Sequence, residues 1–194
     1  MKSAMFRLPF ISVLVAAVVA VLPLAGPAAV SAAPTKTYPT YDYLIGVEPI
    51  CSLDPSEPLC PDIARADNGD TIAIKGSGTL SAHAPATGGG SFVHKNAAGT
   101  VLATGTWTAT RLMSFKAFGA DPTLGFPSSF TGGKAVMLVA LWVGGVHVHD
   151  AVLTVDCDLG TNPPGISEGI KLAVKDALNF NKHVSGANVF ILEG

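Results

Sequence analysis

The sequence predicts an all-β protein, an antiparallel β-barrel or β-sandwich of about seven to eight strands, with a disulfide-pinned N-terminal arm. Three observations lead to this prediction. From Asp70 onward, apolar and polar residues alternate with a period of two, as in half-buried strands. Turn residues divide these runs at intervals of roughly 8–12 residues, which is typical of antiparallel sandwiches and barrels. No segment of about ten residues or more keeps a helical period, so helix is expected to be minor.

The composition sets the class of protein and excludes one class of partner. The chain has 194 residues, of which 48% are hydrophobic and 13% are charged, and its mean hydropathy is +0.44. This length favours one domain, and so apolar a chain is not expected to be disordered. The formal net charge of −2 lacks the basic excess that binds a phosphate backbone, so no nucleic-acid partner is expected.

Residues 1–32 have the pattern of a secretory signal peptide. Lys2 and Arg7 provide a positive start, residues 8–24 carry no charge, and residues 30–32 are small enough for a cleavage site. We expect cleavage after Ala32 and a secreted, extracellular protein. An uncleaved membrane anchor is the alternative, and no later apolar run is long enough to span a membrane.

Residues 33–69 are expected to form the arm. Cys51 and Cys60 enclose a short loop that contains proline, and in an oxidising compartment such a pair is expected to form a disulfide. The third cysteine, Cys157, lies in a strand-like run and is interpreted as a buried thiol, although a bridge from it to Cys51 or Cys60 stays open. Pro61 suits the first position of a helix, so residues 61–66 are expected to form a short helical turn.

Residues 70–194 are expected to form the β-domain. The run at 135–143 is continuously apolar and should be covered on both faces, whereas the connection at 119–133 is long enough to suggest a function. The expected strands are residues 71–83, a strand opening at 91–94, 100–115, 135–143, 146–159, 169–175, 178–181 and 187–192.

One group of residues has the pattern of a metal site. His147 and His149 are two positions apart on an expected strand, so both side chains should point to one face, the inward face marked by Cys157. Two adjacent imidazoles on a strand are a common basis for zinc or copper sites, with His83 or His94 as a further ligand. The alternative is that both histidines are ordinary hydrogen-bonded or solvated residues at the rim of the domain.

No motif assigns a reaction. The sequence contains no nucleotide-binding loop and no nucleophile elbow, so neither catalytic nor ligand-binding residues are assigned. The plan of a signal peptide followed by a small antiparallel β-domain rich in glycine resembles the secreted dirigent-type and lipocalin-type barrels. This resemblance is one of architecture and implies no catalytic residue.

Three functions remain open at this point. The first is a secreted, non-catalytic β-domain that binds a small or apolar ligand or a surface. The second is a barrel enzyme of the isomerase or cyclase kind that acts on an apolar substrate through the shape of a pocket and one or two polar groups. The third is a metal-binding protein that uses His147 and His149.

Overall fold

The computed structural model describes residues 38–81 and 85–194. The predicted signal peptide, its cleavage site and the candidate ligand His83 lie outside the described residues.

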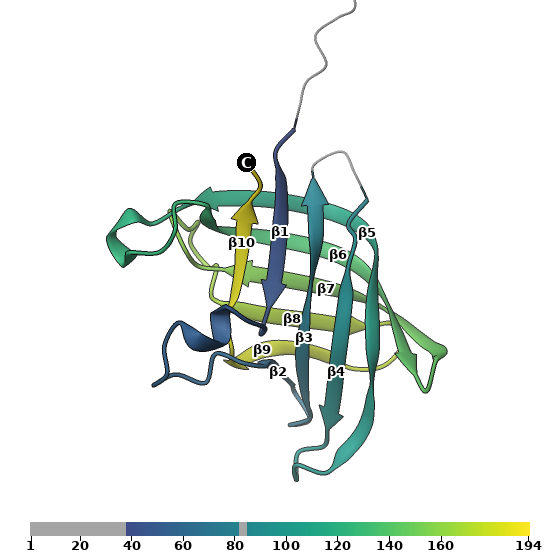
Figure 1. The fold of residues 1–194 in the computed structure, drawn as a ribbon. Coiled ribbons are helices and arrows are strands. Elements are labelled where there is room, and N and C mark those ends of the chain that lie inside the picture. Colours follow the sequence, from purple (N-terminus) through teal and green to yellow (C-terminus); the bar gives the residue numbers. More distant parts are fainter. Residues whose placement is uncertain (1–37, 82–84) are drawn as a thin grey trace, which may run out of the picture. The chain divides into compact units, whose positions relative to one another are not determined.

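Ten antiparallel strands make up the described fold (Figure 1). Helix in the described residues is limited to two 3-10 turns, η1 (Ile50–Ser52) and η2 (Pro122–Leu124), so the prediction of an all-β fold is confirmed. The strands are β1 (Thr40–Ile45), β2 (Asp62–Ala66), β3 (Thr71–Ser81), β4 (Gly89–Lys95), β5 (Val101–Gly119), β6 (Phe130–Val143), β7 (Val146–Cys157), β8 (Gly169–Val174), β9 (Asn179–Ser185) and β10 (Asn188–Leu192).

The hydrogen bonds between strands close into a ring, which makes the fold a barrel. The ring runs β3-β4-β5-β6-β7-β8-β9-β2 and returns to β3. β1 and β10 form a second bridge between β3 and β6, because β1 pairs with both β3 and β10 and β10 pairs with β6. In Figure 1, β1, β3 and β4 cross in front of β6, β7 and β8. A closed ring leaves few unpaired strand edges.

The segment expected to be an arm contributes two of these strands. β1 lies between β3 and β10, and β2 lies between β3 and β9. The helical turn expected at residues 61–66 is wrong, because these residues form β2. A segment this short carries too little pattern to specify its own conformation, so its pairing with two neighbouring strands decides.

The disulfide is confirmed between Cys51 and Cys60, whose Cα atoms are 5.3 Å apart. It closes the connection between β1 and β2, which also contains η1. Cys157 is a free, buried thiol at the end of β7, and burial raises its pKa far above the usual range. The thiol is therefore unreactive in the folded protein.

Replacing Cys51 and Cys60 with serine is expected to lower the free energy of unfolding by about 2–3 kcal/mol, because the bridge restricts the unfolded chain. Urea unfolding of the variant and the parent measures this difference. Peptide mapping without reductant is the control, and a bridge that contains Cys157 would contradict the pairing.

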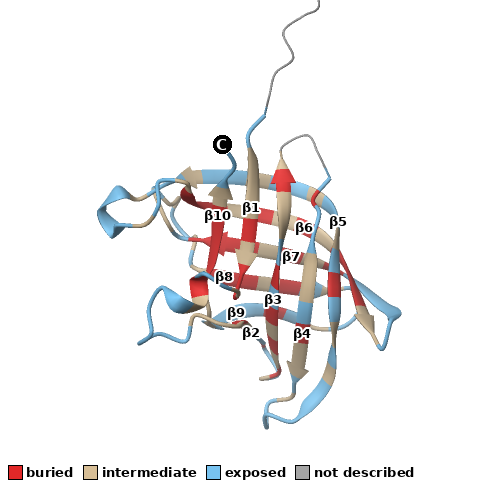
Figure 2. Cartoon of the chain, in the orientation of Figure 1, coloured by how far each residue is buried: buried red, intermediate tan, exposed pale blue. Residues whose placement is uncertain are grey.

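The inward faces of the strands fill most of the barrel. Figure 2 shows buried segments along β7, β8 and β10, and the largest fully buried side chains include Trp107, Tyr43 and Phe180. Trp107 donates from its indole nitrogen to the Lys75 carbonyl at 3.1 Å, and the Tyr43 hydroxyl donates to the Thr87 carbonyl at 2.7 Å. The polar atoms of these two large residues are therefore satisfied inside the core.

Candidate functional site

Four hairpins meet at one end of the barrel, which we call the hairpin end. They connect β2 to β3, β4 to β5, β6 to β7 and β8 to β9. The register places them together, since Thr71 at the start of β3 pairs with Lys95 at the end of β4, and Val143 pairs with Val146 across the β6–β7 turn. The inward residues near these turns therefore surround one opening.

A cavity of about 330 Å³ lies at the hairpin end. Of the described residues that line it, only His94 and His149 have polar side chains. This volume is at the lower end of the range for small-molecule sites, which are mainly apolar with a few polar groups. The lining residues are Ile72, Phe92, His94, Ala103, Leu141, Val143, Val148, His149, Val174, Ala177, Leu178 and Phe180.

A glycine makes room for one wall of this cavity. Phe92 on β4 pairs with Gly105 on β5, and a Cβ atom at Gly105 would lie 2.8 Å from the Phe92 ring. The same Cβ atom would lie even closer to the Trp142 backbone oxygen, so a residue other than glycine would clash with both the ring and the neighbouring strand. On the other side of the barrel, Phe180 packs against the His94 ring edge-on, with 5.4 Å between the ring centres.

His94 is held by a carboxylate. His94 pairs with Ile72 on β3 and with Ala103 on β5, so its side chain faces the interior of the barrel, as theirs do. Its Nε2 lies 3.0 Å from Oδ2 of Asp70, a buried residue at the end of the β2–β3 turn. A carboxylate only accepts hydrogen bonds, so Nε2 carries a proton, and in the neutral ring Nδ1 is then the acceptor.

His149 is exposed and lines the cavity at its rim, from the inward face of β7, whereas His147 does not line it. His149 pairs with the buried Leu141, whereas His147 pairs with Trp142, the next residue along β6. Adjacent strand residues point to opposite faces, so the expectation that the two histidines share one face is wrong. The cause is a β-bulge: the register shifts between Leu141 and Trp142, and Val148 is the extra residue.

On the outer face, His147 has partners of its own. Its Nε2 lies 3.0 Å from Oδ1 of Asp150, and its ring centre is 5.3 Å from that of Trp142. Among residues 38–81 and 85–194, no group of three or more His, Cys, Asp or Glu side chains has the spacing of a metal site. The structure thus brings His94 and His149 to one cavity and separates His147 from them, and the zinc or copper site stays a prediction.

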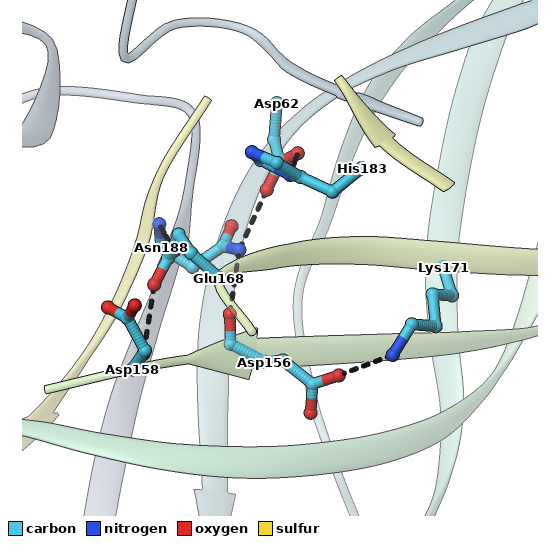
Figure 3. A network of polar contacts seen from close by, with 7 residues as sticks. All are labelled: Asp62, Asp156, Asp158, Glu168, Lys171, His183 and Asn188. Carbon is cyan, nitrogen blue, oxygen red and sulfur yellow. Dashed lines mark hydrogen bonds and ion pairs between the residues drawn. The ribbon is translucent and has the colours of Figure 1, made fainter. Parts of the chain in front are cut away.

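A network of buried polar groups lies away from the hairpin end, where β10 begins beside β2, β7 and β8 (Figure 3). The Asn188 side chain donates to Oδ2 of Asp62 at 2.7 Å, and its backbone N–H donates to Oε1 of Glu168 at 2.7 Å. Asp156 is fully buried and pairs with Lys171 at 3.0 Å and with Lys134 at 3.5 Å. These contacts join segments that are far apart in the sequence.

Two carboxyl groups of this network hold protons near neutral pH. Burial raises the pKa of Asp62 to about 7, although hydrogen bonds from Asn188 and from two backbone amides oppose the shift. Burial also raises the pKa of Glu168 to about 8. His183 Nδ1 is 3.7 Å from Oδ1 of Asp62, too far for a hydrogen bond, and burial lowers the His183 pKa. Asp62 and His183 therefore lie within ion-pair distance but share no hydrogen bond.

A second cavity, of about 550 Å³, lies beside Glu168 and is bordered by the loop between Cys51 and Cys60. Two of its carboxylates already have partners: Glu168 accepts from the Asn188 and Asp158 backbone, and Asp54 accepts from Ser56. The cavity at the hairpin end has walls that are more uniformly apolar and a His149 ring without a partner among the described residues. It is the better candidate for a ligand site.

No helix in the described part of the chain is long and apolar enough to cross a membrane. Comparison of the chain with known protein families, with curated proteins and with solved structures finds no match. Function therefore has to be argued from the residues themselves.

Proposed function

We propose that this protein is a secreted, non-catalytic β-barrel that binds a small apolar ligand in the cavity at its hairpin end. The observation that carries the proposal is an opening of about 330 Å³ with apolar walls in a barrel that is otherwise filled by side chains. Transfer of apolar surface from water into such a site is favourable by about 25 cal/mol per Å². The signal-peptide pattern and the disulfide support secretion.

The size of the cavity limits the ligand. A water molecule takes about 30 Å³ of liquid, so the cavity has room for roughly eleven groups of that size. Val148, which lines the cavity, is 41% exposed, so the apolar wall continues to the surface and an apolar chain that enters the barrel would contact this side chain.

Replacing Ala103 with phenylalanine is expected to fill the cavity and to weaken binding of 1-octanol, a neutral probe of suitable size, by at least about tenfold. Isothermal titration of the full chain, with its disulfide intact, measures the affinity. The matched control is Ala98→Phe, which places the same ring on the exposed β4–β5 turn and should leave affinity unchanged. Equal affinities for the two variants would contradict this site.

One observation favours an enzyme of the isomerase or cyclase kind as the second candidate. A histidine oriented by a buried carboxylate beside an apolar cavity is an arrangement used for proton transfer, and Asp70 and His94 have it. Such an enzyme would use the same cavity. Chemical conversion of a bound molecule, followed by mass spectrometry, would assign this function instead.

A further inference from the structure

The polar groups of the cavity are chemically uniform. Both polar side chains that line it, His94 and His149, are imidazoles, and no Asp, Glu, Lys or Arg is among the described residues of the lining. The Asp70 carboxylate already has a partner, because it is hydrogen-bonded to His94. The described lining therefore holds no carboxylate to pair with a cation, whereas its two imidazoles can pair with an acid.

His94 is arranged to bind an acid. Asp70 holds a ring proton on Nε2, so Nδ1 of the neutral ring carries the lone pair. A carboxylic acid is ionised at pH 7. When its carboxylate binds at Nδ1, this nitrogen takes up one proton from solvent and an N–H bond forms, which leaves an imidazolium between two carboxylates. The negative charge of Asp70 stabilises that imidazolium.

His149 completes the arrangement. Its ring makes no hydrogen bond with any other group in residues 38–81 and 85–194, and it lies on the inward face opposite Leu141. An N–H of this ring can donate to the second oxygen of a carboxylate. A neutral alcohol has one oxygen and no comparable charge, so it can use only part of this pair.

We propose that the ligand is an amphiphilic carboxylic acid, whose hydrocarbon part fills the apolar cavity and whose carboxyl group binds His94 and His149. This inference rests on the proposed function and specifies the ligand class of the same site. The volume of the cavity suits an acid with a chain of about eight carbons, since it holds roughly eleven water-sized groups.

The test compares three probes of equal chain length, octanoic acid, 1-octanol and octylamine, by isothermal titration at pH 7 with the full chain. Octanoic acid is expected to bind at least about tenfold more tightly than 1-octanol, because charge-assisted hydrogen bonds are the stronger ones. Octylamine is expected to bind most weakly. His94→Gln and His149→Gln should each reduce the preference for the acid over 1-octanol about three- to tenfold, because the alcohol uses only part of the histidine pair.

His147→Gln is the matched control, because His147 lies on the outer face and should leave all three affinities unchanged. Binding of 1-octanol to each histidine variant shows that its cavity has formed. Equal binding of octanoic acid and 1-octanol, or a preference for octylamine, would overturn the inference and leave the proposed function standing. If none of the three probes binds the parent protein, the proposed function itself fails.

Discussion

Replacing Trp107 with alanine is expected to lower the free energy of unfolding by about 3–5 kcal/mol. Trp107 is 1% exposed and is the largest of the fully buried side chains in the described core. Its removal leaves a void among rings and also leaves the Lys75 carbonyl without its indole donor, which is 3.1 Å away in the parent. The rigid ring of strands cannot close around a space of this size. Urea unfolding followed by circular dichroism measures the loss.

The second tryptophan provides the control for this prediction. Trp142 is half-buried on the outer face, where its indole donates to the Thr108 hydroxyl at 3.1 Å. Trp142→Ala removes the same side chain without emptying the barrel, so a loss below about 1.5 kcal/mol is expected. Similar losses for the two variants would show that the interior is less tightly packed than described.

Raising the pH from 6 to 8 is expected to destabilise the protein by on the order of 3 kcal/mol. Asp62 and Glu168 have pKa values of about 7 and about 8 in the folded protein, well above their ordinary values near 4. Between the ordinary and the raised values the folded chain holds these protons and the unfolded chain releases them. The stability they contribute is therefore complete below about pH 4 and is lost as the pH rises through 7 and 8.

Of the other shifted groups, His183 and Asp67 act at lower pH, and the buried Cys157 thiol acts only above about pH 8.5, where the unfolded chain releases its proton. Burial lowers the pKa of His183, so His183 opposes the slope below about pH 6.5, where the unfolded chain would bind its proton. The exposed Asp67 forms an ion pair with Lys182 at 2.7 Å, and this pair lowers the pKa of Asp67. The contribution of Asp67 to stability is therefore lost only as the pH falls through the acid range. The steepest alkaline loss is therefore expected from Asp62 and Glu168.

Unfolding free energies at several pH values, measured with urea, test this assignment. Asp62→Asn is expected to remove the part of the slope that ends near pH 7 and to leave the part from Glu168, which continues to near pH 8. Asp67→Asn is the control and should leave the slope above pH 6 unchanged. A stability that stays constant from pH 6 to 8 in the parent protein would contradict the protonated state of the network.

The sequence by itself determined the class of fold and the approximate positions of eight strands, although β5 extends to Gly119 and β6 begins at Phe130, so the connection expected at 119–133 is shorter than predicted. Alternation with a period of two is a local property, because each strand has to present one face to the core, and it is visible from residue 71 to residue 192. The disulfide was also predictable from local sequence, because the short loop between Cys51 and Cys60 brings the two cysteines together. The conformation of the arm was harder to predict from the sequence, because β1 and β2 are short and take their conformation from β3, β9 and β10.

Only the tertiary structure decided which side chains form the candidate site. His147 and His149 were expected on one face because alternation was assumed to continue, but the register of β6 against β7 inserts Val148 and reverses it. Asp70 meets His94 only because β3 and β4 pair, and Asp62 meets Asn188 across a separation of 126 residues. Nothing near either residue in the sequence signals these contacts, because pairing, bulges and register are set by partner strands and not by the strand itself.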